Sequence, residues 1–316
     1  MIETLCHICY KPTFGETVIK DKVYMHKTCI EHGFFESIIE PDVALYRSFG
    51  FGRNCDVYNA IMLNITDVCN TTCKLCYYPV GPKHKPLEQI KQEAARFPSS
   101  KIWLSGGEPT CHPDFMEIIQ LPNFGAVLTN GIKFGDIDFL NQFIDAVGTD
   151  AYGYVPIEIS LHAEVDDRRM VAVNNLRSLG LTTFCAMFSI NSLDDVAPCV
   201  EIWESNKDVF ANMRIRLPFN SWGQESVKHI YMSDLLNTVL NLLPGLTLTE
   251  NIGGNSIYNI NLAYGDRYIS LCCAPHKEAA DLTNTSCAPR MLANDNHVYP
   301  IPYGLIINEG ISKGII

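Results

Sequence analysis

Three closely spaced cysteines constrain this chain more than any other feature. Cys69, Cys73 and Cys76 form a C-x3-C-x2-C loop directly after the apolar run 60–66, which predicts a strand. Three thiolates without a fourth can hold three irons of a [4Fe–4S] cube and leave the last iron open, whereas electron-transfer clusters normally take four cysteines. The spacing therefore favours a cluster that binds and activates a ligand. The alternative is three buried or zinc-binding cysteines, and the preceding strand argues against it, because a motif counts only in its predicted context.

Length and composition describe a soluble globular protein. The 316 residues suffice for one large α/β domain with small appendages, and no window approaches 18 uninterrupted apolar residues, so we expect no membrane span. The chain starts without the basic and apolar regions of a secretory signal. Thirteen cysteines then indicate a reducing, cytoplasmic setting, in which clustered thiols are metal sites and not disulfides. The net charge of -11 argues against a broad electrostatic grip on nucleic acid but leaves room for a local basic groove.

Residues 1–35 form a unit with a metal-binding pattern of its own. A C-x2-C knuckle and a C-x2-H knuckle flank the alternating segment 17–25, which predicts a hairpin. So short a segment needs a bound metal or a cross-link to fold, and we expect a zinc-ribbon-like metal site. The metal would be Zn²⁺ or mononuclear iron, since sequence alone does not separate the two. The alternative is a hairpin without metal. The expected ligands are Cys6, Cys9, Cys29 and His32, with His26 and Cys55 as substitutes for the fourth place.

After a connector at 36–59, strand and helix patterns alternate from 60 to about 245. Six βα units without an internal antiparallel signal imply parallel strands with helices outside, and ligands at the carboxyl ends of the strands. Asp136, Asp194 and Ser233 stand where helix N-caps are wanted. The predicted strands are 60–66, 101–105, 126–129, 157–162, 182–190 and 214–219, and the predicted helices are 86–97, 114–121, 136–147, 168–179, 193–205 and 233–243.

A second motif follows the second predicted strand. Gly106 and Gly107 would let the backbone approach a ligand closely, and the Glu108 carboxylate could take an ammonium group. With the cysteine loop one βα unit earlier, the chain resembles the radical S-adenosylmethionine (radical SAM) superfamily. The resemblance implies a partial (β/α)6 barrel, a [4Fe–4S] cluster on the three loop cysteines, and S-adenosylmethionine (SAM) chelated to the open iron. An electron from the cluster would cleave SAM to methionine and a 5′-deoxyadenosyl radical that abstracts hydrogen from a substrate.

The resemblance also implies roles for residues at the other strand ends. Ser160 would lie near the SAM carboxylate or ribose, and Ser189 and Asn191 near the ribose. The family's aromatic residue before the third cysteine is Leu75 here, so Tyr77 is expected to pack on the adenine. The residues expected at the SAM site are Tyr77, Gly106, Gly107, Glu108, Asn130, Ser160, Ser189, Arg214 and Arg216, of which one arginine would reach the carboxylate.

His162 is the predicted catalytic residue. It shares a face with Ser160 by strand alternation and could give a proton to the substrate or accept one. A hydrogen-bonded structural histidine at a strand end is the alternative.

The segment 22–33 carries a further resemblance. It is similar to the N-terminal segment of the radical SAM subgroup that contains archaeal tetraether lipid synthase and pterin-modifying enzymes, although this chain lacks both prolines of their C-P-x-C and K-x-C-P-x-H-G patterns. The likeness does not extend to the substrate region, so lipid chemistry is not carried over.

The last segment, 246–316, predicts an α+β cap over the barrel. Gly265-Asp266 between two alternating runs is a hairpin signal. Many radical SAM enzymes hold auxiliary [4Fe–4S] clusters in such an extension, but Cys272 and Cys273 would point to opposite faces of a strand, which leaves Cys287 and one of them. A cap with substrate contacts is the favoured alternative. The apolar ending 304–316 predicts packing on the barrel or on a second subunit of a homodimer.

The predicted function is a radical SAM enzyme whose reaction class, isomerase, lyase or transferase, stays open. It would need a one-electron donor such as flavodoxin or ferredoxin. A small metabolite under the cap suits the acidic charge best, a nucleotide or a base in a nucleic acid comes next, and a peptide, as in maturases, is third. The rival from another class is a non-catalytic metal-binding or regulatory module with a degenerate core, against which the intact cysteine and Gly-Gly-Glu motifs argue.

Overall fold

The computed structural model describes most of the chain. The residues outside the description are 1, 50–59, 75, 77, 164–165, 218–228, 249–257, 273–288, 301–303, 305–306, 309, 312 and 316.

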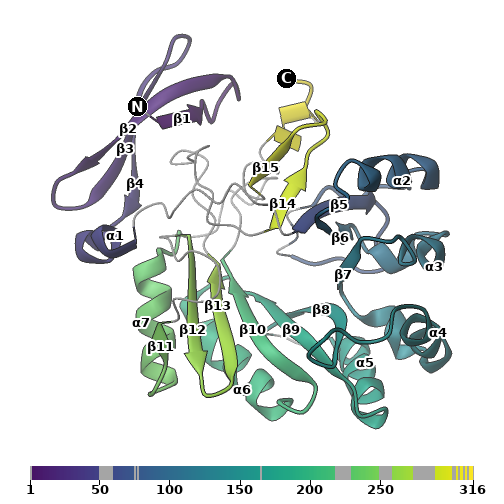
Figure 1. Ribbon diagram of the computed structural model, residues 1–316. Helices are drawn as coiled ribbons and strands as arrows, with labels where there is room; N and C mark the ends of the chain where they lie inside the picture. Colours follow the sequence, from purple (N-terminus) through teal and green to yellow (C-terminus); the bar gives the residue numbers. More distant parts are fainter. Residues whose placement is uncertain are drawn as a thin grey trace.

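The N-terminal segment forms a four-stranded antiparallel sheet in the order β1-β2-β3-β4, which stands apart at the top left of Figure 1. Its buried face carries Val23 and Met25, and the equally buried Lys27 donates to the Leu5 carbonyl oxygen at 2.8 Å. The predicted hairpin is thus confirmed as the β2–β3 pair of a larger sheet. The bounds are β1 Ile2–Leu5, β2 Pro12–Ile19, β3 Val23–Cys29 and β4 Gly33–Glu40, followed by α1 Val43–Phe49.

An 11-stranded sheet forms the body of the molecule, in the order β11-β12-β13-β10-β9-β8-β7-β6-β5-β14-β15. Its centre, β5 to β10, consists of six parallel neighbours, one for each predicted βα unit. The last strand begins at Phe210 and not at Arg214, because it follows the turn after α6 directly and its alternate burial starts there. The bounds are β5 Ala60–Thr66, β6 Lys101–Gly106, β7 Phe124–Thr129, β8 Tyr154–His162, β9 Thr182–Ser189 and β10 Phe210–Arg216.

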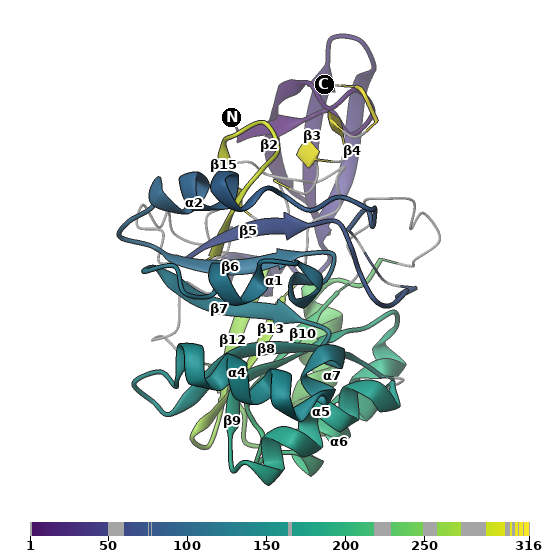
Figure 2. The ribbon, with the colours of Figure 1, turned by 90° about the vertical axis from the view of Figure 1, so that its right-hand side faces the viewer.

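Helices cover the outer face of this sheet (Figure 2), where alternate strand residues such as Ile157 and Ile159 join the main apolar core. Asp136 caps α4 as predicted, by accepting from the amides of Asp138 and Phe139. The other two cap predictions are wrong: a 3₁₀ turn started by Ser192 leads into α6, and α7 begins before Ser233. The helices are α2 Leu87–Ala95, α3 Phe115–Ile118, α4 Ile137–Val147, α5 Asp167–Ser178, α6 Val196–Ser205 and α7 Met232–Leu242.

The C-terminal strands extend the body sheet at both edges. The predicted hairpin is confirmed: β12 Asn259–Tyr264 and β13 Arg267–Cys272 pair around Gly265, whose φ is 65°, and β13 lies parallel to β10. At the other edge β14 Pro289–Leu292 lies parallel to β5 and pairs with β15 Val298–Pro300. The short β11 Thr247–Leu248 completes the first edge. The described part of the expected cap is therefore continuous with the barrel sheet.

A second apolar cluster joins distant parts of the chain. Leu5 and Tyr10 of the N-terminal sheet pack with Met62 of β5, Met291 of β14 and Ile307 near the end of the chain. The apolar ending thus packs on the chain's own barrel at Ile307. Among the described helices, none has the length and apolar character needed to cross a membrane.

Candidate functional site

Two neighbouring cavities lie at the carboxyl ends of the parallel strands. The smaller has a volume of about 100 Å³ and the larger about 360 Å³, and they share the lining residues Thr71, Cys73, His162, Arg169 and Ser189. The three loop cysteines and the Gly-Gly-Glu motif all line the smaller cavity. This is the edge of the sheet at which α/β folds bind their ligands. The remaining residues around the smaller cavity are Tyr78, Ser105, Leu128, Thr129, Asn130, Ser160, Met187 and Arg216.

The cysteine loop brings three sulfur atoms to one cavity wall. Among the described residues that line this cavity, Cys69, Cys73 and Cys76 are the only cysteines. Burial raises the pKa values of the Cys69 and Cys76 thiols, so removing their protons is unfavourable while no cation is near. A coordinated metal deprotonates such thiols outright. Three converging sulfurs without a fourth fit a [4Fe–4S] cluster with one iron left open.

The two motif glycines allow the β6 end to lie against the cysteine loop. The Gly106 φ is 126°, and a Cβ on this residue would lie 2.3 Å from the Thr66 carbonyl oxygen. A Cβ on Gly107 would lie 2.4 Å from the Val68 carbonyl oxygen. The Gly107 amide instead donates to Thr66 O at 2.7 Å, and the Glu108 amide to Val68 O at 2.7 Å. No residue with a side chain could make this approach without moving the backbone.

The Glu108 carboxylate joins two strand ends. Its Oε1 accepts from the Thr110 hydroxyl and the Thr129 hydroxyl, each at 2.7 Å, and its Oε2 accepts from the Asn130 amide at 2.7 Å. Burial raises the pKa of this carboxyl group, which these donors oppose. Asn130 in turn donates to the Asn70 side chain at 2.7 Å and so reaches the cysteine loop. The prediction placed Glu108 at the SAM amino group, and the further acceptor capacity of Oε2 keeps that role open.

The other predicted SAM-site residues divide between the cavity and the barrel interior. Arg216 lies at the small cavity and donates to the Ser189 hydroxyl at 2.8 Å. Arg214, two residues earlier on β10, forms an ion pair at 2.8 Å with the fully buried Glu158 and does not line either cavity. Arg216 is therefore the better placed of the two arginines. Asn191 lines the larger cavity, whereas Tyr77 lies outside the described residues.

His162 lies where the two cavities meet. Burial, and then the positive charges of Arg169 and Arg216, lower its pKa to about 4, so the imidazole is neutral near pH 7. Its Nδ1 lies 3.4 Å from the Ser189 carbonyl oxygen, which can only accept a hydrogen bond. The proton therefore belongs on Nδ1, and Nε2 is left as an acceptor. Nε2 can thus accept a hydrogen bond from a ligand, whereas the lowered pKa makes the imidazole a weak base near pH 7.

Arg169 is a cavity residue that the sequence analysis did not single out. It lies in the first turn of α5, donates from Nη1 to the Ser160 carbonyl oxygen, and lies with Nη2 3.2 Å from the Cys73 sulfur. One sequence signal was available: Arg168 and Arg169 stand together at a helix N-terminus, where the helix dipole disfavours positive charge. A cation at such a position suggests a compensating anion nearby.

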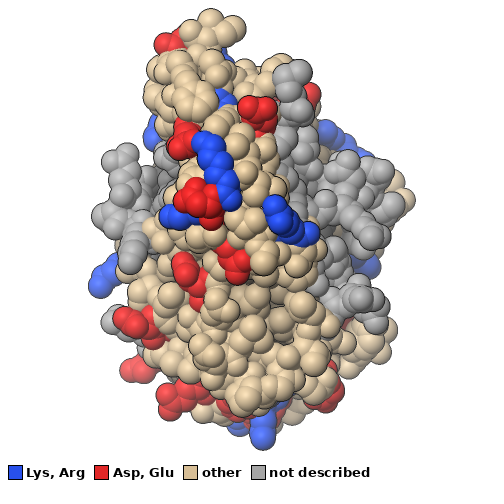
Figure 3. All heavy atoms as spheres, turned by 90° about the vertical axis from the view of Figure 1, so that its left-hand side faces the viewer, with Lys and Arg blue, Asp and Glu red and all other residues tan. Residues whose placement is uncertain are grey.

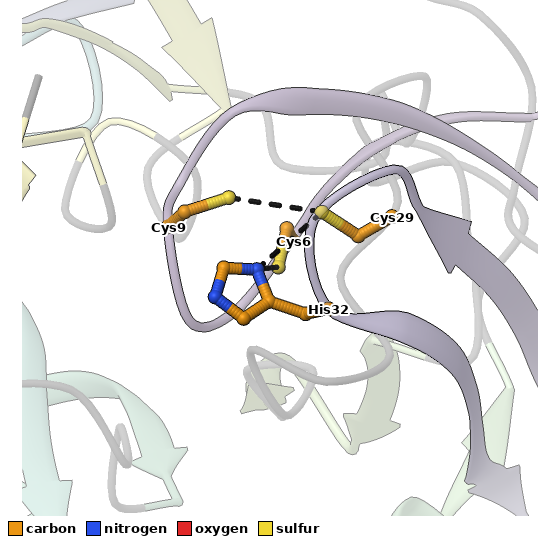
Figure 4. Close-up of side chains that lie close together, drawn as sticks. All are labelled: Cys6, Cys9, Cys29 and His32. Atoms are coloured by element: carbon orange, nitrogen blue, oxygen red, sulfur yellow. Dashed lines mark hydrogen bonds between the residues drawn. The ribbon is translucent and has the colours of Figure 1, made fainter.

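The N-terminal sheet brings four predicted ligands together (Figure 4). The ligand atoms of Cys6, Cys9, Cys29 and His32 all lie within 4.8 Å of one another. His32 Nδ1 lies 3.6 Å from Cys6 Sγ and 3.5 Å from Cys29 Sγ, and the Cys9 and Cys29 sulfurs are 3.8 Å apart. Tetrahedral zinc with its usual bond lengths separates sulfur and nitrogen ligands by roughly 3.5–3.8 Å, so the group fits Zn²⁺.

The substitutes for the fourth ligand do not join this group. His26 instead contacts Glu36, with Nε2 at 2.7 Å from the carboxylate, and Cys55 lies outside the described residues. The auxiliary-cluster alternative stays a prediction: Cys272 ends β13, and Cys273 and Cys287 lie outside the described residues.

The comparisons with known proteins agree with both sites. Residues 63–136 match the radical SAM superfamily model, and residues 1–41 match the HMPTM N-terminal zinc ribbon domain. The chain is 28% identical over 183 residues to 7,8-dihydro-6-hydroxymethylpterin dimethyltransferase of Methanocaldococcus jannaschii, which covers 45% of this chain and 36% of that protein. It is 40% identical over 74 residues to GTP 3′,8-cyclase of Haemophilus ducreyi, covering 20% and 21%.

More distant similarities include a peptide-modifying enzyme. PqqA peptide cyclase of Ruegeria pomeroyi is 26% identical over 164 residues, which cover 45% of this chain and 43% of that protein. The matches thus span only about a fifth to two fifths of the relatives named here. Streptococcus suis SuiB bound to S-adenosylmethionine has a TM-score of 0.48 at 11% identity, covering 82% of this chain and 63% of that chain. A likeness at this level adds nothing to the strand order, from which the fold is assigned.

Replacing Gly107 by alanine should reduce cluster binding. The new Cβ would lie 2.4 Å from Val68 O and 2.7 Å from Asp67 O, so the cysteine loop must shift. We expect the iron bound after anaerobic reconstitution to fall by more than half and the free energy of unfolding to fall by about 1–3 kcal/mol. Gly81→Ala is the control, because its Cβ would meet Asp67 Cβ at an ordinary 3.5 Å. Full iron content in Gly107→Ala would contradict the argument.

Acid should destabilise the protein partly through His162. The folded pKa of about 4 lies below the usual 6.5, so the unfolded chain binds the proton more readily. Stability from this group is complete above about pH 6.5 and is lost as the pH falls toward 4. We expect His162→Gln to remove up to about 3 kcal/mol of the loss between pH 7 and pH 4, measured by urea unfolding before cluster reconstitution. An unchanged pH dependence in the variant would show that the imidazole is not neutral in the folded protein.

The two metal sites should be separable by substitution. Cys6→Ala removes one of four converging ligands of the N-terminal group, so bound zinc should be lost while the iron of the reconstituted protein is retained. Metal analysis by plasma mass spectrometry measures both. Cys199→Ala, a change at a buried thiol of α6, serves as the control and should retain both metals. Unchanged zinc with reduced iron in Cys6→Ala would mean that the cysteines are divided wrongly.

Proposed function

We propose that this chain, a member of the radical SAM superfamily with an N-terminal zinc ribbon, is an enzyme that cleaves SAM reductively at a [4Fe–4S] cluster and abstracts hydrogen from a substrate. The observation that carries the proposal is the convergence of Cys69, Cys73 and Cys76 on one cavity beside the Gly-Gly-Glu loop. The superfamily match over residues 63–136 supports it, since it contains both motifs.

The cavity residues fit the two cofactors. The three sulfurs would bind three irons of the cluster, which when bound supplies the electron that cleaves SAM to methionine and a 5′-deoxyadenosyl radical. The Glu108 Oε2 atom would accept from the SAM ammonium group, and Arg216 would donate to its carboxylate. The larger cavity, which Ser189 and Asn191 line, has room for the nucleoside part.

The barrel's other residues keep this chemistry in place. Main-chain bonds between the two motif loops hold the cluster site against the SAM site. The neutral His162, with its Nδ1 proton directed to Ser189 O, lines both cavities, and its Nε2 is left to accept a hydrogen bond from a bound hydroxyl or amine group.

The favoured substrate is a small heterocyclic metabolite or nucleotide. Two relatives are named for a pterin and for GTP, and the N-terminal zinc ribbon model is shared with the pterin-modifying subgroup. The face shown in Figure 3 does not favour a nucleic acid polymer, because its described lysine and arginine side chains are scattered beside acidic ones and form no broad basic area. A peptide is the second candidate, on the similarity to PqqA peptide cyclase.

The remaining partners are proposals of the same kind. We infer a one-electron donor such as flavodoxin or ferredoxin and a reducing, cytoplasmic setting, because low-potential clusters need both. The homodimer stays a prediction, since Ile307 of the apolar ending packs against the chain's own Leu5 and Met291.

Anaerobic turnover tests the proposal directly. Reconstituted protein with dithionite and SAM should release 5′-deoxyadenosine, detected by mass spectrometry, and Cys73→Ala should reduce the release at least a hundredfold because an iron loses its ligand. Cys111→Ala is the matched control. This thiol follows the Gly-Gly-Glu motif but does not line the smaller cavity, so 5′-deoxyadenosine should still form. No 5′-deoxyadenosine from protein that carries four irons would refute the function.

Deuterated substrates then separate the substrate classes. Transfer of deuterium into 5′-deoxyadenosine from a pterin or purine nucleotide would support the favoured class, and transfer from a peptide alone would replace it.

A further inference from the structure

Arg169 is a buried cation at the cavity. Its side chain is 3% exposed, and among the residues that the structure describes none places a carboxylate oxygen within ion-pair distance of it. Its two acceptors are the Ser160 carbonyl oxygen and the Cys73 sulfur, and its buried Nε–H has no described acceptor. Burying an uncompensated charge is unfavourable, so this position calls for negative charge at the cavity.

The neighbouring arginine shows that the position is specific. Arg168 has a side chain 57% exposed and is paired with Asp166 at 2.5 Å, so its charge is compensated by the helix cap and by water. Arg169, one residue later, points inward from a rigid helix turn and lines both cavities. The Arg169 guanidinium therefore meets the cysteine loop on the cavity side.

Building on the proposed function, we propose that Arg169 is a positioning residue that sets the reduction potential of the cluster by donating a charge-assisted hydrogen bond to the Cys73 thiolate. A [4Fe–4S] cluster with three thiolate ligands becomes more negative on reduction. A fixed N–H donor and positive charge 3.2 Å from one ligand sulfur stabilise the reduced form more than the oxidised form. The potential is thereby raised.

The contact also makes the three cysteines inequivalent. Cys69 has a different neighbour, since the Asn130 amide lies 3.9 Å from its sulfur, and Cys76 has a sulfur 3.5 Å from the Tyr78 carbonyl oxygen, which cannot donate. Cys73 has a guanidinium donor 3.2 Å from its sulfur. The Arg169 guanidinium also donates a hydrogen bond to the Ser160 carbonyl oxygen, which fixes its orientation at the end of β8.

The test measures the potential of the reconstituted cluster, without turnover. In Arg169→Met the midpoint from a dithionite-mediated titration followed by electron paramagnetic resonance should fall by at least 59 mV, which is a tenfold shift of a one-electron equilibrium toward the oxidised form. Arg169→Lys retains the charge but not the two-armed geometry, so it should recover only part of the shift. Arg168→Met is the matched control and should keep the parent potential.

Two outcomes would overturn the inference. An unchanged potential in Arg169→Met with normal iron content would show that the contact has no electronic effect. If Arg169→Met and Arg169→Lys both fold, retain zinc and yet bind no iron, Arg169 instead supports the cysteine loop structurally. Because the readout needs no SAM cleavage, a shifted potential in a protein that releases no 5′-deoxyadenosine would leave this inference standing while the proposed function fails.

Discussion

The site depends on the main-chain contact between two loops that leave adjacent parallel strands. The amides of Gly107 and Glu108 donate to the carbonyl oxygens of Thr66 and Val68, each at 2.7 Å. This contact is only as close as it is because Gly106 and Gly107 lack a Cβ. The Glu108 carboxylate then carries the connection to the next strand end through Thr129 and the Asn130 amide. Three successive strand ends thereby form one rigid wall behind the cysteines.

Buried charges are handled differently in the barrel interior and at its mouth. Glu158 and Arg214 compensate one another inside the barrel, at 2.8 Å. At the mouth, Arg169 contacts a cysteine sulfur and a carbonyl oxygen, and its charge also lowers the pKa of the nearby Asp166 without a described ion pair between them. Since low-dielectric surroundings make an unpaired charge costly, the interior charges are paired with each other, whereas the Arg169 charge faces the cavity. At the mouth, burial and then the positive charges of Arg169 and Arg216 lower the pKa of His162 to about 4.

The two cysteine sites differ in the number of ligands and in whether a coordination position on the metal is left open. In the N-terminal sheet, three sulfurs and one imidazole nitrogen lie within 4.8 Å of one another, and these four ligands leave no open position on a tetrahedral metal. In the barrel, three sulfurs line a cavity that continues into a larger one. A site with all four positions filled suits a structural metal, and a site with an open position suits catalysis. The N-terminal metal is therefore best understood as one that stabilises the fold of a small sheet.

The sequence by itself determined the local features: the C-x3-C-x2-C and Gly-Gly-Glu motifs, the six βα units, the hairpin around Gly265, and the ligand set of the ribbon. These are set by spacing and periodicity over a few residues, and the six strands and four converging ligand atoms follow them. The start of β10 was missed by four residues, because burial against neighbouring strands decides where pairing begins. Two of the N-cap predictions failed because a 3₁₀ turn started by Ser192 precedes α6 and because α7 begins at Met232.

Only the tertiary structure decided which side chains meet. Arg214 and Arg216 share a strand face and could not be told apart in the sequence, but one pairs with Glu158 and the other lies at the cavity. Likewise, Arg169 lies 96 residues from Cys73 along the chain, and only the packing of α5 against the strand ends brings it to 3.2 Å. Periodicity records the face on which a residue lies, whereas its partner depends on strand order and register, which are properties of the whole sheet.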